Sequence, residues 1–172
     1  DLHDGLQSRL VLLAVQAGVA RGSTAELREE IEAAIDELRA LVHGVMPAEL
    51  TERGLPAAVK GLADRVPIST ALSVAGFETR PAPAVESTAF FVTAEAMTNA
   101  VKHAHASELT VTLDRGPERL VIEVRDDGIG GASVGEGIRS MTDRVEALGG
   151  ELRIDSALGA GTLLHVELPC AS

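Results

Sequence analysis

The residues best suited to chemistry lie in two short stretches, EAMTNAVKH and DDGIG. In the first, Glu95 and Asn99 are four residues apart, and Lys102 and His103 follow one helical turn later. Residues spaced by three or four share a helix face, so one helix would direct a carboxylate, an amide and a cation the same way. In the second, the strand-like segment LVIEV leads into Asp126 and a glycine-rich loop. Together the two stretches predict a site for a nucleotide and its Mg²⁺ ion.

Each polar side chain of the first stretch suits one part of such a ligand. The amide oxygen of Asn99 is a hard, neutral ligand for Mg²⁺, an ion that keeps several waters and takes few protein ligands. Glu95 could hold one of those waters, whereas Lys102 and His103 could offer charge or hydrogen-bond donors to phosphate oxygens. The alternative interpretation of this stretch is a solvated helix face with an ordinary charge pair.

The second stretch suits the base and the phosphates. Ionised Asp126 only accepts hydrogen bonds, so it could receive the exocyclic amine of adenine. Five of the ten residues from 128 to 137 are glycines, which let a backbone pass close to a flat ring and offer free N–H groups to phosphates. For DDGIG alone, a plain Asp–Gly turn is the alternative. The glycines assigned to this site are Gly128, Gly130, Gly135 and Gly137.

Composition narrows the class of protein. The 172 residues carry a net charge of −11 and are 45% hydrophobic but only 2% aromatic, so the core must be aliphatic. Direct binding to nucleic acid is not expected, because it needs clustered lysine and arginine. The single cysteine, Cys170, excludes an internal disulfide and is expected to be an inert tail residue. No apolar run approaches the ~18 residues of a membrane span, and no signal-peptide pattern is present.

Apolar spacing predicts a helical first part. The stripe in residues 1–20 and the capping-box pair Ser23 and Glu26 predict two helices that form an antiparallel hairpin. One hairpin cannot cover stripes this wide, so residues 1–47 are predicted to dimerise as a four-helix bundle. The chain opens with Asp1 inside the first helical pattern. We therefore expect a cytoplasmic fragment, with any membrane anchor of the full-length protein in a missing upstream region.

Residues 48–172 change character and mix strands with helices. The whole pattern predicts an α+β chain in which the helical hairpin is followed by an α/β sandwich. The expected helices are a short one starting at Pro56 and two longer ones at 85–104 and 138–148. The expected strands are 68–74, 109–113, 120–124, 151–156 and 162–168.

Four segments, in this order, resemble the boxes of the GHKL ATPase superfamily, which includes histidine kinases, gyrase, Hsp90 and MutL-type proteins. EAMTNAVKH resembles its N box, VRDDGIGG its first glycine box, GEGIRSMTDRVEALGG its second and GAGTLLHVELP its last. The resemblance implies the Bergerat ATP-binding fold, a mixed sheet with helices on one face. It assigns Asn99 and Glu95 to Mg²⁺ and its waters and Asp126 to adenine. It also assigns the four glycines to the base-proximal loop and lid, and Thr162 to the neighbourhood of the adenine.

The first residues resemble a phosphoacceptor. DLHDGLQ is similar to the phosphoacceptor motif of sensor histidine kinases of the DesK/NarX-like group, and ELRALVHGVMPAELTERGLPAAV resembles that group's second helix and connector. The resemblance implies a homodimer in which His3 attacks the γ-phosphate of ATP, with Asp4 as its base-like partner. The phosphoryl group would then pass to an aspartate of a NarL-type response regulator. One position departs from the group, because its glutamine five residues after the histidine is Ser8 here and Gln7 stands one place early.

Two other interpretations keep the same ATPase fold. An anti-sigma-type serine kinase phosphorylates a partner protein but needs no leading hairpin with a His–Asp pair. A non-catalytic nucleotide-sensing dimerisation module would bind ATP without transferring phosphate, and an intact Glu95 and Asn99 favour catalysis over it. The other histidines carry no comparable pattern. His103 and His105 would point to different faces of a helix, which disfavours a zinc site, and His165 is expected on the exposed face of a strand.

Overall fold

Strands β1 to β5 form one mixed sheet. The computed structural model describes residues 47–170, which belong to a single compact unit that starts at Pro47. Neighbouring strands follow the order β1-β2-β3-β5-β4, in which β1 runs parallel to β2 and the other pairs are antiparallel. The strands are β1 (Ser69–Ala75), β2 (Glu108–Arg115), β3 (Arg119–Asp126), β4 (Glu151–Asp155) and β5 (Thr162–Pro169).

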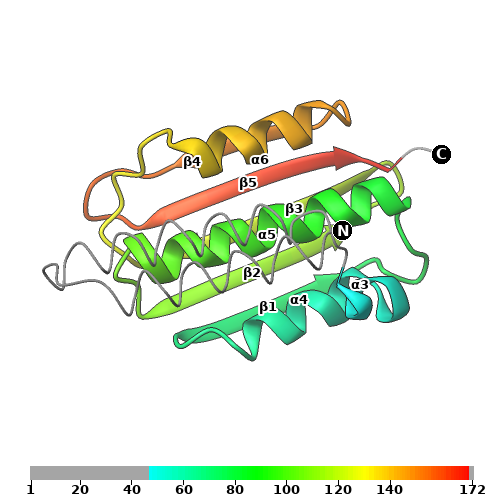
Figure 1. The fold of residues 1–172 in the computed structure, drawn as a ribbon, viewed down its shortest axis with the longest axis horizontal. Helices are drawn as coiled ribbons and strands as arrows, with labels where there is room; N and C mark the ends of the chain where they lie inside the picture. The colour runs from blue at the N-terminus through cyan, green and yellow to red at the C-terminus, as the bar shows by residue number, and fades with distance from the viewer. Residues whose placement is uncertain (1–46, 171–172) are drawn as a thin grey trace, which may run out of the picture. The chain divides into compact units, whose positions relative to one another are not determined.

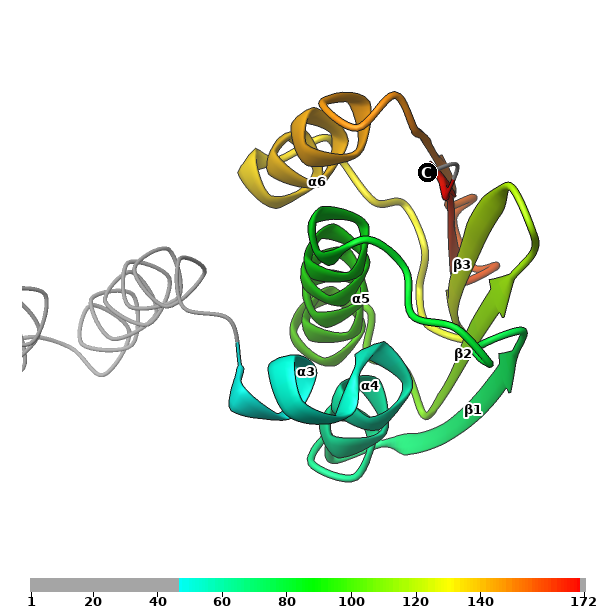
Figure 2. The same cartoon turned by 90° about the vertical axis from the view of Figure 1, so that its right-hand side faces the viewer.

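Helices α3 to α6 cover one face of this sheet (Figure 1), and Figure 2 shows that the opposite face carries no described helix. The helices are α3 (Ala48–Arg53), α4 (Leu55–Ala63), α5 (Pro83–His103) and α6 (Glu136–Glu146). None of these described helices has the length and apolar character needed to cross a bilayer. The arrangement confirms the expected α+β class and the sheet with helices on one side.

Alternation along the strands separates the two faces of the sheet. In β3, Leu120, Ile122 and Val124 are at most 4% exposed, whereas the residues between them are more exposed. Successive strand side chains point to opposite faces, so the buried set faces the helices. Leucine, valine and alanine residues dominate the buried core, which also contains the edge-to-face pair Phe90 and Phe91, with 5.7 Å between ring centroids. The core is therefore mainly aliphatic, as the low aromatic content predicts.

Helix α5 is the longest described element and lies across the middle of the sheet, in front of it in Figure 1. Ten of its 21 residues are buried. The helix starts at Pro83, a residue favoured in the first helical turn because its missing N–H would have no intrahelical partner there. Its last turns carry the predicted nucleotide-site residues, and its first turn carries Glu86, a buried carboxylate to which the sequence analysis gave no role.

The predicted elements agree with the observed ones to within a few residues, with one break that was not predicted. The short helix expected to start at Pro56 is α4, and the structure adds α3 before it, separated from α4 by Gly54. Gly54 has a φ of +84°, a conformation that glycine adopts at little cost. The hairpin and dimer expected for residues 1–47 fall, apart from Pro47, outside the described residues and stay predictions.

Cys170 packs against the core, so the expectation that it belongs to a tail is wrong. Its N–H donates to the carbonyl of Glu118 at 2.7 Å, and the residue packs against the hydrophobic core. This burial raises the pKa of the Cys170 thiol, which favours the unreactive protonated form. The sequence could not show this contact, because it depends on β5 ending beside the turn that precedes β3.

The two faces of β3 predict different costs of truncation. Ile122→Ala should lower the free energy of unfolding by about 2–5 kcal/mol, because it leaves a cavity between the sheet and the helices. Val121→Ala, on the other face of the same strand, should cost only about 1 kcal/mol. Urea denaturation of the two variants checks this, and equal losses would contradict the assignment of the core face.

Candidate nucleotide site

The C-terminal half of α5 holds the first group of predicted site residues. Glu95 and Asn99 are half-buried, and each is next to a fully buried residue of the helix, so they lie at the margin of its buried face. Within the described part of the chain, neither side chain forms a hydrogen bond to the protein. Lys102 and His103 follow in the exposed last turn. The arrangement leaves a carboxylate and an amide oxygen available to a ligand, as the sequence predicts.

Asp126 is the last residue of β3, and its carboxylate is only half satisfied. The residue is 7% exposed, and Oδ1 accepts a hydrogen bond from the backbone N–H of Gly128 at 2.9 Å. No described residue donates to Oδ2. A carboxylate oxygen without a protein donor can accept from a ligand, and an exocyclic amine of a purine would supply one. The geometry therefore fits the predicted role of Asp126 toward adenine.

The loop that follows Asp126 is held by its neighbours on two sides. The N–H of Ile129 donates to the carbonyl of Ala104, just after α5, at 2.8 Å. On the other side, Gly131 donates to the carbonyl of Ser156 at 2.9 Å, and Gly159 donates back to the carbonyl of Ile129 at 2.7 Å. The end of α5, the loop after β3 and the loop after β4 therefore meet at one place.

Two glycines in this region are needed for close packing of backbones. A Cβ on Gly128 would lie 2.2 Å from the carbonyl oxygen of Ala104. Gly130 has a φ of +62°, and its Cβ would lie 2.1 Å from the carbonyl oxygen of Ala157. Backbone oxygens cannot move away as a flexible side chain can, so any side chain at either position would push the loops apart. The sequence pattern predicts a ligand role for these glycines, whereas the structure shows that both are needed for the contact between the loops.

Thr162 lies directly opposite Asp126 in the register of β3 and β5. Its Oγ1 is 2.9 Å from Oγ of Ser156, and Ser156 Oγ also accepts from the N–H of Ala132 at 3.0 Å. The structure thus brings Asp126 and Thr162 together, as the family resemblance implied. Ser156 is a further polar residue at this place that sequence reasoning missed, because nothing but its position after β4 signals it.

The two glycines expected in the lid differ from each other. Gly135 precedes α6 with a φ of −88°, and a Cβ there would have its nearest neighbour 4.0 Å away. Gly137, inside the first turn of α6, lies against α5, and its Cβ would be 2.3 Å from Oε1 of Glu95. The start of α6 therefore packs on the carboxylate that we assign to the metal and its waters.

Asp127 has a structural role that its neighbour does not share. Its carboxylate accepts from the N–H and hydroxyl of Ser107 at 2.8 and 2.6 Å and from the N–H of Glu108 at 2.9 Å. These donors, led by the Ser107 hydroxyl, lower the pKa of Asp127 from 3.8 to about 2. Asp127 thus fastens the start of β2 and has its acceptors occupied.

The described histidines other than His103 show no sign of a metal site. His105 follows α5 with a φ of +52°, so the helical argument applied to His103 and His105 does not hold for it. Among the described residues, no group of three or more His, Cys, Asp and Glu side chains could hold a metal ion. His165 lies in β5, and its ring nitrogens are 3.0 Å from Glu123 and 3.4 Å from Glu167.

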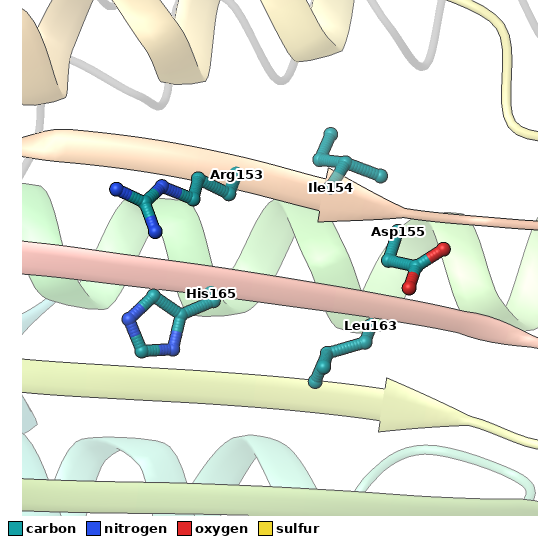
Figure 3. Close-up of a pocket in the computed structure, with 5 residues that line it drawn as sticks. All are labelled: Arg153, Ile154, Asp155, Leu163 and His165. Atoms are coloured by element: carbon teal, nitrogen blue, oxygen red, sulfur yellow. The ribbon is translucent and has the colours of Figure 1, made fainter.

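A shallow hollow on the sheet is separate from the predicted site. Figure 3 shows its lining side chains, which come from β4 and β5 and include His165. None of the residues assigned to the nucleotide lines it. The hollow therefore does not correspond to the nucleotide site. Its lining residues are Arg153, Ile154, Asp155, Leu163 and His165.

Comparison with known families identifies the class of protein. Residues 84–172 match the family described as histidine kinase-, DNA gyrase B- and HSP90-like ATPase, so the chain belongs to this family of ATP-binding domains. Residues 1–50 match a second family, described as histidine kinase. The two matches in this order define a histidine kinase core, and they confirm the superfamily that the sequence motifs indicated.

Relatives over the full chain are sensor kinases. The chain is 32% identical to the sensor histidine kinase MctS of Rhizobium johnstonii and 29% identical to the histidine-protein kinase/phosphatase UhpB of Salmonella typhimurium, in each case over 98% of its length. It is 26% identical to the oxygen sensor histidine kinase NreB of Staphylococcus carnosus, also over 98%. The chain covers 41%, 37% and 54% of these three proteins.

Solved structures support the fold. The chain aligns over 98% of its length with 98% of the Acinetobacter baumannii histidine kinase AdeS, at a TM-score of 0.57 and 15% identity. It aligns over 99% with 86% of the histidine kinase domain of a blue-light activated kinase from Erythrobacter litoralis, at a TM-score of 0.52 and 21% identity. At these identities, the likeness concerns the fold alone.

The adjacent aspartates provide a matched test of adenine recognition. Asp126→Asn keeps an oxygen for the N–H of Gly128 but turns a donor toward the ligand, so it should weaken binding of a fluorescent ATP analogue by about 10- to 100-fold, the value of a charge-assisted hydrogen bond. Fluorescence titration measures this change. A variant that binds as tightly as the wild type would remove Asp126 from the base site.

Asp127→Asn is the control. It should leave the affinity for the ATP analogue close to the wild-type value, because its acceptors contact only Ser107 and Glu108. The folded-state pKa of Asp127 lies below its ordinary value, so its contribution to stability is present above pH 3.8 and is lost as the pH falls toward about 2. Acid denaturation of Asp127→Asn should lack this component.

The two lid glycines provide a second matched pair. In Gly137→Ala the new methyl group displaces the carboxylate of Glu95, which should weaken Mg²⁺-dependent binding of ATP by about five- to tenfold, equivalent to about 1 kcal/mol. Gly135→Ala places its methyl group in open space and should bind as the wild type does. Titration with and without Mg²⁺ distinguishes them, and equal behaviour would refute the contact between α6 and Glu95.

Proposed function

We propose that this chain is the catalytic core of a two-component sensor histidine kinase, which autophosphorylates His3 with ATP and passes the phosphoryl group to an aspartate of a response regulator. The observation that carries the proposal is the pair of half-buried side chains of Glu95 and Asn99 on α5, neither of which has a hydrogen-bond partner among residues 47–170. Both residues belong to α5, and Ala104, just after this helix, accepts a hydrogen bond from Ile129 in the loop that follows Asp126. The match of residues 1–50 to histidine kinases supports the choice of a histidine as acceptor.

Four groups of described residues would bind Mg-ATP. Asp126 would accept the adenine amine through its unused oxygen, with Thr162 beside it. The glycine-rich segment from the first loop to the start of α6 would surround the base and phosphates with backbone N–H groups. Asn99 and Glu95 would hold Mg²⁺ and its waters, and Mg²⁺ supplies neutralisation of the charge on the transferring phosphoryl group. Lys102 and His103 would stabilise phosphate oxygens from the last turn of α5.

The chemical step requires a neutral imidazole. Nε2 of His3 attacks the γ-phosphorus with its lone pair as the bond from that phosphorus to the β–γ bridging oxygen breaks, and ADP leaves. The proton on Nδ1 of His3 stays in place. The carboxylate of Asp4 accepts a hydrogen bond from this N–H and so stabilises the positive charge that forms on the ring. Catalysis is otherwise positioning and electrostatic stabilisation. Both His3 and Asp4 lie outside the described residues, and their roles rest on the motif.

The partners follow from the same proposal. A homodimer would form through the helical hairpin of residues 1–47, and the response regulator would be of the NarL type. Direct binding of this chain to nucleic acid is not expected, because its net charge is −11. The chain would act in the cytoplasm.

Transfer of labelled γ-phosphate from Mg-ATP tests the proposal. The wild-type chain should acquire label that is labile in acid and stable in base, as phosphohistidine is. His3→Gln should acquire none, because it lacks the nucleophile. Asn99→Asp should label about 100-fold more slowly, because the metal and phosphates are misplaced. Gln7→Ala, a change four positions after His3 in the same motif, should keep the wild-type labelling rate and serves as the control.

Other outcomes would favour a different member of the same fold. Label that survives His3→Gln would show a serine or threonine acceptor, as in an anti-sigma-type kinase. Tight ATP binding by a wild-type chain that acquires no label would indicate a nucleotide-sensing module. Loss of labelling in Gln7→Ala would give Gln7 a role in autophosphorylation itself.

A further inference from the structure

An ion pair between half-exposed Arg80 and buried Glu86 joins the loop before α5 to the first turn of that helix. Glu86 is 4% exposed, and Arg80 lies in the loop between β1 and α5. Arg80 donates to the Glu86 carboxylate through Nε at 3.2 Å and through Nη2 at 2.5 Å. Two parallel bonds of this kind fix direction as well as distance. The nucleotide site described above makes no use of either residue.

The same two side chains cap both helices at the break that Gly54 introduces. Arg80 donates to the last carbonyls of α3, those of Leu50 at 2.8 Å and Thr51 at 3.0 Å. Glu86 Oε1 accepts from the N–H of Leu55, the first residue of α4, at 3.0 Å. Helix ends leave such groups without partners, and a cation at a C-terminus and an anion at an N-terminus also suit the helix dipoles. The pair thus holds α3, α4 and α5 in one arrangement.

The break itself is shaped around the pair. A Cβ on Gly54 would lie 3.2 Å from Oε1 of Glu86 and 3.5 Å from Nε of Arg80, and its φ of +84° favours glycine. Leu50 and Leu55, on either side, are fully buried. Apolar contacts alone would bury these leucines, but they would not fix the direction of the α3 axis on the domain. The hydrogen-bonded ion pair of Arg80 and Glu86, at the edge of the core, fixes that direction.

The position of the pair separates it from nucleotide binding. Glu86 precedes Glu95 by nine residues on α5, a distance of about 13 Å along a helix that rises 1.5 Å per residue. The pair instead contacts α3, through which the chain enters the domain from the segment that carries His3. The match to histidine kinases ends at residue 50, and the ATPase match begins at residue 84. The pair therefore connects the last residues of one match with the first turn of the other.

We propose that Arg80 and Glu86 are positioning residues for phosphoryl transfer, which hold α3 in a fixed direction on the ATP-binding domain so that the segment bearing His3 is presented productively. This inference rests on the proposed kinase function. The proposal predicts that loss of the ion pair slows phosphoryl transfer to His3 but leaves the affinity for ATP nearly unchanged.

Arg80→Ala in the full chain tests the proposal. At saturating Mg-ATP the initial rate of labelling should fall by about 10- to 100-fold, the effect of misplaced reactants. The affinity for a fluorescent ATP analogue should stay within about twofold, since distant sites rarely couple by more than a few tenths of a kcal/mol. Amide hydrogen exchange should become faster in α3, with little change in the loop that follows Asp126.

Two further variants separate positioning from general stability. Arg80→Lys keeps the charge but cannot form the bidentate contact, so its labelling rate should lie between those of wild type and Arg80→Ala. Arg53→Ala removes another arginine of the same region, one whose surface contact to Glu49 spans 3.6 Å, and should label as the wild type does.

The outcomes are distinct. A wild-type labelling rate in Arg80→Ala, or unchanged exchange in α3, overturns the positioning role. A parallel fall in ATP affinity and labelling overturns it as well, because that result indicates general destabilisation. A wild-type chain that acquires no phosphohistidine refutes the proposed kinase function, and exchange in α3 then decides whether the pair holds that helix.

Discussion

Helix α5 packs ten buried residues against the sheet and its neighbours, and this packing fixes the direction of every polar side chain on the helix. A rotation by one residue, about 100°, would remove Glu95 and Asn99 from the margin of the buried face. The same packing places Glu86 in the core at the other end of the helix. One apolar interface therefore positions both the candidate metal ligands and the pair that holds α3.

Hydrogen bonding separates the polar residues that serve the fold from those that are open to a ligand. Glu86 and Asp127 have their acceptors occupied by protein donors, and each holds a helix or strand end. Asp126 uses only one oxygen, and Glu95 and Asn99 use none within the described residues. These three side chains therefore keep acceptor oxygens that a nucleotide and its metal could use. Neighbouring aspartates in one motif thus have different roles.

Local sequence patterns failed where a distant segment decided the outcome. The break at Gly54 is held by Arg80, which donates to the carbonyl of Leu50. Arg80 belongs to no predicted helix or strand and lies 26 residues after Gly54 in the chain. The assignment of Cys170 to a tail failed because its partner, Glu118, belongs to another strand region. His105 was placed on a helix that ends two residues earlier. Each error concerns an element's end, where tertiary contacts outweigh propensity.

The sequence by itself determined the class of fold, most element positions and the membership of the candidate site, since helical and strand periodicity and the order of the glycine motifs are local properties. Asn99 and Asp126 could be chosen from their residue types and spacing. Only the tertiary structure decided that Gly137 packs on Glu95, that Ser156 joins Thr162, and that Arg80 and Glu86 cap two helices at once. Those contacts join segments far apart in the chain, and their geometry follows from how the layers pack.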